Sequence, residues 1–201
     1  MPSRNTVKQF SVPAYYHVYN RGAGKQTIFR DAADKRHFMH ILQRHIDPKD
    51  DSTDRFGVAY KKYDIELVAY CLMKNHFHLM LFQEDDPMAL TGLMRSVATA
   101  YTMYFNKRYK QSGHLFQGIY KASLITNEPY FLHITRYIHL NPRAYRTYKW
   151  SSLRQFLGES EAGWIHPERV LDMTPAKYLR FVEDYEQLHE DRKLLEKSLG
   201  L

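Results

Sequence analysis

Two histidines stand one residue apart in the most apolar stretch of the chain. They are His76 and His78, at the start of the run HFHLMLF over residues 76–82. Side chains alternate along a β-strand, so both imidazoles would share one face and could bind a single divalent cation. A pair of histidines on a strand is, however, more often part of a packed core. The spacing alone therefore leaves a structural role and a ligand role open.

A second group of residues able to do chemistry lies in a segment with helical periodicity. Tyr137 and Asn141 are four residues apart, so they share a helix face, on the flank of an apolar stripe. The stripe consists of Phe131, Ile134 and Ile138. Both polar residues could face along a sheet surface. A tyrosine beside such a stripe is usually a packing residue, so periodicity alone does not assign Tyr137 a function.

Positive charge is concentrated in one part of the chain. The net charge is +7, and residues 107–149 contain eight Lys and Arg against one Glu, which equals the whole excess. Several Tyr and Phe side chains are interleaved with these cations. Such a segment fits a surface that neutralises phosphates and stacks on bases. A solvated basic face with no ligand is the alternative.

The elements that must position these residues follow from alternation, helical spacing and turn residues. Strands are predicted over residues 15–19, 65–73, 76–82 and 119–125, and helices over 31–46, 87–105 and 127–141. The two central strands are separated by Lys74 and Asn75, which predicts an antiparallel hairpin. The order of elements predicts an α+β fold, a ferredoxin-like antiparallel sheet with helices packed on it.

Composition bounds the class of protein. With 201 residues, 44% hydrophobic and 25% charged, the chain is predicted to be a folded globular protein, with residues 1–158 as one domain. Residues 159–201 are expected to be a C-terminal helical extension outside the core, with an apolar seam of Tyr178, Phe181, Val182 and Tyr185. Cys71 is the only cysteine. Because the sequence shows neither a signal peptide nor a membrane span, a cytoplasmic protein is expected.

Five runs resemble, in order and spacing, the single-tyrosine HUH transposases and their REP-associated relatives. They are YCLMKNHFHLML at residues 70–81, HVYNRG with KQTIF at 17–29, SGHLFQGIYKA at 112–122, RYIHLNP at 136–142 and YKWSSLRQFLG at 148–158. The resemblance covers residues 12–158 and implies the HUH endonuclease fold. Ile119 departs from it, because relatives commonly have a basic residue after Gly118.

The resemblance implies the roles of the residues introduced above. It makes His76, His78 and Asn141 the ligands of a divalent metal, and Tyr137 the nucleophile that forms a 5′-phosphotyrosine. Mg²⁺ is the expected cellular ion, with Mn²⁺ as a substitute because it accepts imidazole readily. Three other tyrosines are competing nucleophiles, although their spacing fits packing or base stacking better: Tyr101, Tyr104 and Tyr109.

The basic segment and the resemblance together predict the partners. The residues predicted to contact DNA are Arg21, Lys107, Arg108, Lys110, His114, Gln117, Lys121, Arg136 and Arg143. The expected substrate is single-stranded DNA with an adjacent hairpin, met at a bacterial nucleoid, and no membrane is involved. A homodimer is also predicted, because family members commonly pair and the tail carries an apolar seam.

Three functions are compatible with these patterns. The first is a transposase that nicks and joins single-stranded DNA. The second is a domesticated DNA-binding protein of the same fold that no longer cuts, for which loss of a site residue would be the simplest signature. The third, a replication or plasmid-transfer nickase, is disfavoured by the short chain, which shows no helicase or primase segment.

Overall fold

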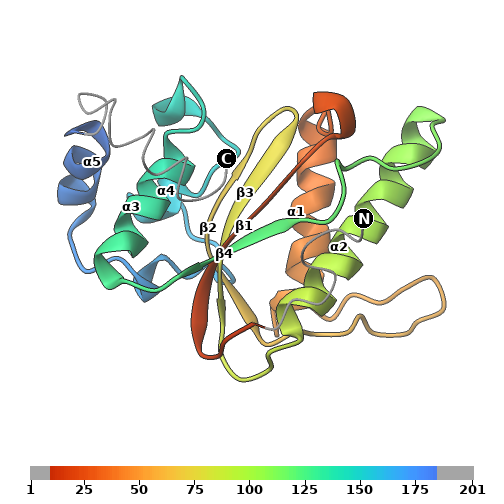
Figure 1. The fold of residues 1–201 in the computed structure, drawn as a ribbon, viewed down its shortest axis with the longest axis horizontal. Helices are drawn as coiled ribbons and strands as arrows, with labels where there is room; N and C mark the ends of the chain where they lie inside the picture. The colour runs from red at the N-terminus through yellow and green to blue at the C-terminus, as the bar shows by residue number, and fades with distance from the viewer. Residues whose placement is uncertain (1–9, 185–201) are drawn as a thin grey trace, which may run out of the picture.

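A four-stranded antiparallel sheet forms the centre of the computed structural model, which describes residues 10–184 (Figure 1). Its strands are β1 (Ala14–Arg21), β2 (Ile65–Leu72), β3 (His76–Gln83) and β4 (Lys121–Ile125), in the order β2-β3-β1-β4. The larger helices are α1 (Ala32–Ile46), α2 (Ala89–Tyr109) and α3 (Glu128–His139). The order βαββαβ with all neighbours antiparallel confirms the predicted ferredoxin-like fold.

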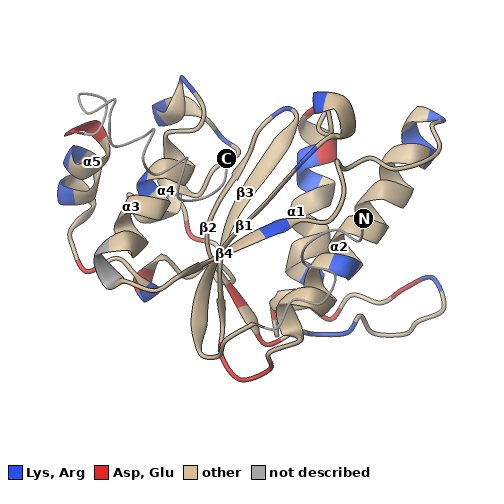
Figure 2. Cartoon of the chain, viewed as in Figure 1, with Lys and Arg blue, Asp and Glu red and all other residues tan. Residues whose placement is uncertain are grey.

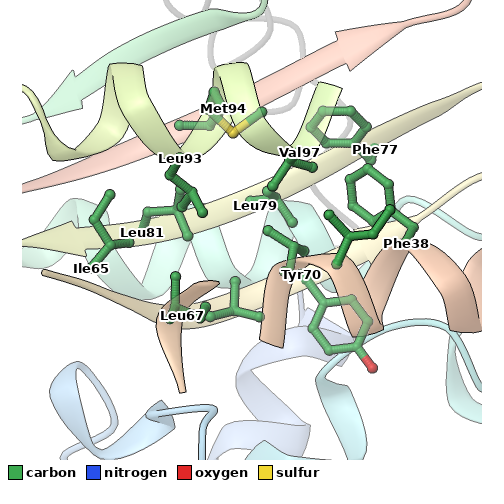
Figure 3. Close-up of a cluster of buried hydrophobic side chains, with 14 of the residues drawn as sticks. Phe38, Ile65, Leu67, Tyr70, Phe77, Leu79, Leu81, Leu93, Met94 and Val97 are labelled. Atoms are coloured by element: carbon green, nitrogen blue, oxygen red, sulfur yellow. The ribbon is translucent and has the colours of Figure 1, made fainter. Parts of the chain in front are cut away.

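One face of the sheet is covered by α1 and α2. Inward residues of β2 and β3 such as Leu67, Leu79 and Leu81 meet Leu93 and Val97 of α2, as Figure 3 shows. These residues are almost fully buried, and the alternation of β3 puts Phe77 in the same cluster. The period of the sequence therefore determines which side chains fill this layer, because every second residue of a strand points into it.

The opposite face carries α3 and the shorter helices that follow it. These are η2 (Tyr145–Thr147), α4 (Leu153–Phe156), η3 (Pro167–Arg169) and α5 (Pro175–Glu183), while η1 (Ala23–Lys25) follows β1. Met80 and Phe82 of β3 pack here against Ile134 and Ile138 of α3. In Figure 1, α3, α4 and α5 lie on one side of the sheet, and α1 and α2 lie on the other. The sheet is thus the middle of three layers.

Asp34, in α1, connects that helix to the C-terminal end of α2. Asp31 caps α1 by accepting hydrogen bonds from the amides of Ala33 and Asp34. The buried Asp34 carboxylate accepts hydrogen bonds from the hydroxyls of Tyr104 and Tyr109 at 3.1 and 2.8 Å. It also forms an ion pair with Arg108 at 2.7 Å. This buried charge is therefore fully partnered, as burial requires.

The segment after residue 158 is part of the packed structure. Tyr178 and Val182 of α5 are fully buried in the cluster below α3, and Ile165 is buried against β2. The expectation that this segment lies outside the core is therefore wrong for its described part. The apolar seam predicted for it finds its partner surface on α3, although Tyr185 lies outside the described residues. Among residues 10–184, no helix is long and apolar enough to cross a membrane.

Candidate metal and nucleophile site

The two predicted ligand histidines lie at the start of β3, on the face covered by α3. His76 pairs with Arg21 and His78 with Tyr19 in the register between β3 and β1. The imidazole centroids of His76 and His78 are 5.1 Å apart, while Phe77 between them is buried in the opposite layer. The expected sharing of one strand face is therefore confirmed.

The end of α3 brings the other two residues to the same place. Asn141 follows the last turn of α3, and its Oδ1 lies 3.2 Å from Nε2 of His76. The ring of Tyr137, one turn earlier, lies edge-on to that of His78, with centroids 5.5 Å apart. Residues separated by about sixty positions in the sequence thus form one cluster between a strand and a helix.

The hydrogen bonds of His76 and Asn141 fit a cation between them. Nδ1 of His76 lies 2.7 Å from Oδ1 of Asn75, an acceptor, so Nδ1 carries the proton and Nε2 holds a lone pair. The amide nitrogen of Asn141 donates to the carbonyl of Tyr137 at 3.3 Å, which turns Oδ1 toward His76. Two acceptors therefore face each other. A metal ion would satisfy both, and nitrogen and amide oxygen are ordinary ligand atoms.

Burial keeps the histidines of the cluster neutral. The pKa of His78 lies well below its ordinary value because burial disfavours the charged ring, with further contributions from His17 and His76. Burial also lowers the pKa of His76, and the amide oxygen of Asn141 partly opposes this because it would accept a hydrogen bond from the protonated ring. Neutral imidazole is the form that binds metals, so no proton has to leave before a cation binds.

A third histidine, not predicted from the sequence, belongs to the cluster. His17 of β1 is completely buried, and its Nε2 lies 2.9 Å from Nδ1 of His78. Burial lowers the pKa of His17 to about 3. Alternation along β1 puts His17 on the same face as Tyr19, but its approach to His78 depends on the pairing of β1 with β3, which strand periodicity alone does not give.

Most residues predicted to contact DNA are exposed: Arg21, Lys107, Lys110, His114, Gln117, Lys121 and Arg143. Arg21 donates to Oε1 of Gln117 at 3.1 Å, and Lys121 lies over the ring of Tyr19, with Nζ 5.6 Å from the centroid. Arg21 and Lys121 therefore flank the histidine cluster. Figure 2 shows Lys and Arg around this end of the sheet, whereas the turn after β3, at the other end, is acidic.

Two predicted DNA contacts have other partners in the structure. The guanidinium of Arg136 is buried, donates to the carbonyl of Phe181 at 3.0 Å and lies over the Phe181 ring. Arg108 is bound to Asp31 and Asp34 at 2.6 and 2.7 Å. Both cations hold helices together, so their positions give no support to a role on DNA.

The competing tyrosines belong to the other layer. Tyr101 is fully buried and donates to the carbonyl of Ile28 at 2.6 Å, and Tyr104 and Tyr109 bind Asp34. They lie with α2 on the face of the sheet opposite the histidines. This placement separates them from the histidine cluster, which the ring of Tyr137 contacts.

A chain of hydrogen bonds connects α3 to α5 and to β2. His139 lies 2.8 Å from the hydroxyl of Tyr178 through Nδ1 and 2.8 Å from Oγ of Ser152 through Nε2. Tyr178 donates to Oγ1 of Thr135 at 2.9 Å, and Ser152 accepts from the amide of Tyr70 in β2. The helix that carries Tyr137 is therefore tied to both β2 and α5.

Comparison with known proteins identifies the family. The family model described as "Transposase IS200 like" matches residues 13–141, a span that contains all four predicted site residues. The chain belongs to this family of transposases. A search of curated proteins found no match.

Two solved structures are similar to this chain to different degrees. A REP-associated tyrosine transposase bound to a REP hairpin matches with a TM-score of 0.59 and 11% sequence identity, over 81% of this chain and 96% of that one. A Deinococcus radiodurans protein described as a "putative transposase" matches with a TM-score of 0.38 and 20% identity, over 66% of this chain and 94% of that one. At 11% identity the first match shows a shared fold.

Proposed function

We propose that this transposase nicks and rejoins single-stranded DNA through a covalent bond to Tyr137. The observation that carries the proposal is the cluster itself, in which Asn141 Oδ1 lies 3.2 Å from His76 Nε2 and the Tyr137 ring lies beside His78. A nucleophile and three neutral metal-ligand groups thus meet at one end of the sheet. Membership in the family supports the same assignment.

The residues that would hold the metal are His76, His78 and Asn141. Bound there, Mg²⁺ or Mn²⁺ would polarise the scissile phosphate and orient it for in-line attack. These three side chains carry no charge when the histidines are neutral, and burial keeps them neutral. The charge of the cation is therefore left for the phosphate.

Tyr137 supplies the nucleophile in the proposed reaction. Its phenolic oxygen bonds to phosphorus, the bond from phosphorus to the 3′ oxygen breaks, the phenolic proton passes to solvent, and the departing 3′ oxygen takes up a proton from solvent. The products are a 5′-phosphotyrosine and a free 3′ hydroxyl. Because one phosphodiester replaces another, a 3′ hydroxyl can attack the phosphotyrosine in turn and join strands without ATP.

The proposed DNA surface surrounds the cluster. Three exposed cations lie near the cluster: Arg21 pairs with His76 in the strand register, Lys121 lies over the Tyr19 ring, and Arg143 is two residues from Asn141. They can neutralise phosphates of a bound strand. The REP-associated relative of similar fold was solved with a REP hairpin. A single strand next to a hairpin is therefore the substrate we propose here. The homodimer stays a prediction.

The test is the formation of a covalent adduct. Full-length protein is incubated with a library of 3′-labelled single-stranded hairpins and Mn²⁺, and label that stays on the protein after denaturation is measured. The wild type should retain label, and Tyr137→Phe should not, while its hairpin binding and fold persist. The lost hydroxyl should change stability by about 1 kcal/mol at most. EDTA should also prevent the adduct.

Matched controls separate the nucleophile from its neighbours. Tyr130→Phe changes an exposed tyrosine on the same helix, and Tyr104→Phe changes a competing candidate, so both should keep the adduct. A labelled peptide containing Tyr104, or an adduct that survives in Tyr137→Phe, would contradict the assignment. Hairpin binding without any adduct in the wild type would instead favour a DNA-binding protein that does not cut.

A further inference from the structure

His17 and His78 form a head-on pair of buried rings. Their planes differ by 8°, their centroids are 5.1 Å apart, and Nε2 of His17 lies 2.9 Å from Nδ1 of His78. Two nitrogens this close in nearly parallel rings share a hydrogen bond within the ring plane. One of the two nitrogens must carry the proton and the other must accept it, because a contact at this distance needs one donor and one acceptor.

The direction of this hydrogen bond decides whether His78 can bind a metal. If Nδ1 of His78 donates, its Nε2 has a lone pair and can act as a ligand. If His17 donates instead, the proton of neutral His78 is on Nε2, and both of its nitrogens are blocked. A metal site that includes His78 therefore requires His17 to be the acceptor.

His17 cannot satisfy its other nitrogen in either direction. Its Nδ1 is buried and finds no hydrogen-bond partner among the described residues. A buried polar atom without a partner costs stability, so an apolar side chain would serve the fold better at this position. The polar ring is thus unexplained by packing, but it places an acceptor 2.9 Å from Nδ1 of His78.

A histidine in this place also affects the charge of the site. Metal-bound histidines usually donate their second nitrogen to a carboxylate, a backbone carbonyl or water. Here the acceptor is a nitrogen of a fully buried imidazole, a side chain that carries no negative charge. The acceptor therefore orients His78 without adding negative charge that would compete with the phosphate for the cation.

We propose that His17 is a positioning residue that accepts the Nδ1 proton of His78 and so holds His78 in the tautomer that binds metal. The inference rests on the proposed function, in which His78 is a ligand. It assigns to β1 a part in the metal site in addition to the strand and helix that carry the ligands.

The first test is Mn²⁺ binding to the full chain without DNA, measured by the electron paramagnetic resonance of free Mn²⁺. His17→Phe keeps a ring but removes the acceptor, so affinity should fall about 10–100-fold, the range seen when such partners are lost. Its melting temperature should stay close to that of the wild type, since the orphan Nδ1 of His17 is removed while Nδ1 of His78 loses its partner. His17→Gln can place an amide oxygen near the position of Nε2 and should recover most of the affinity.

A matched control comes from the same strand. Tyr16→Phe also removes a hydrogen bond from a buried side chain of β1, but on the opposite face, where the hydroxyl donates to the carbonyl of Ser11 at 3.0 Å. It should leave Mn²⁺ affinity unchanged. Equal affinity in wild type and His17→Phe would overturn the role of His17 while leaving the metal site intact. A wild type that binds no Mn²⁺ would overturn the metal site as well.

A second measurement does not depend on any variant folding. In metal-free wild type labelled with ¹⁵N-histidine, nuclear magnetic resonance distinguishes a protonated from an unprotonated ring nitrogen. The proposal requires His78 to be protonated at Nδ1 and unprotonated at Nε2. The opposite tautomer would refute it even if Mn²⁺ binds.

Discussion

The hydroxyl of Tyr178 should contribute strongly to the stability of the protein, although it lies in the segment beyond the family match. The group is fully buried, donates to Thr135 at 2.9 Å and lies 2.8 Å from Nδ1 of His139. Ser152 occupies the other nitrogen of that ring at 2.8 Å. Tyr178→Phe removes only the oxygen atom and keeps the ring in place.

The magnitude follows from what the substitution leaves behind. If Ser152 donates to His139, then Nδ1–H of His139 must donate to Tyr178, because a neutral ring has one proton. Tyr178→Phe thus breaks two buried hydrogen bonds and leaves one donor unsatisfied, a loss of about 2–4 kcal/mol in the free energy of unfolding. For a chain of this length, that corresponds to a melting temperature lower by roughly 5–15 °C.

The assay is urea and thermal unfolding of both proteins, with Tyr63→Phe as control. The Tyr63 hydroxyl makes one partly buried contact, with Ser96 at 2.9 Å, so its loss should cost about 1 kcal/mol or less. Equal effects of Tyr178→Phe and Tyr63→Phe would refute the reasoning, because they would mean that the hydrogen bonds of His139 are satisfied without Tyr178.

Three further predictions concern pH, salt and assembly. Burial lowers the pKa of both His17 and His139 to about 3. The unfolded chain therefore binds more protons than the folded chain below pH 6.5. The contribution of these two histidines to the free energy of unfolding is greatest above that pH and declines as the pH falls toward 3. Between pH 6.5 and 5 the free energy of unfolding should fall by about 2 kcal/mol per histidine. Equal free energies of unfolding in urea titrations at the two pH values would contradict this prediction. Affinity for single-stranded DNA should fall steeply with salt, and Arg143→Ala should reduce the slope of log affinity against log salt by about 0.7, whereas Lys49→Ala, at the acidic end of the sheet, should not. The predicted homodimer should be visible by light scattering at tens of micromolar protein, and a monomeric mass there would reject it.

The sequence predicted the sheet and the faces on which His76, His78, Tyr137 and Asn141 lie, because both depend on local patterns. Alternation along residues 76–82 shows which side chains share a face, and the four-residue spacing of Tyr137 and Asn141 shows that they lie on one side of a helix. The resemblance supplied the pairing of this strand with this helix. The structure confirms their proximity, with His76 and Asn141 in contact.

Other features depended on contacts that no local pattern reveals. His17 meets His78 only through the register of β1 against β3, and Tyr178 meets His139 only because α5 folds back onto α3. Arg108 and Arg136 were predicted to contact DNA, but in the structure both bind groups within the protein. A count of positive charges cannot separate cations that are exposed from those paired with a buried carboxylate or a backbone carbonyl.

In evolutionary terms, the hydrogen bonds between α3 and α5 make two distant positions of the chain dependent on each other. A relative without the segment that contains Tyr178 would have an unsatisfied polar ring at position 139, on the helix of its nucleophile. Selection should then favour a smaller or apolar residue at position 139 in the same lineage. The identity of residue 139 would therefore indicate, from the family domain alone, whether a transposase of this kind is followed by a supporting C-terminal helix.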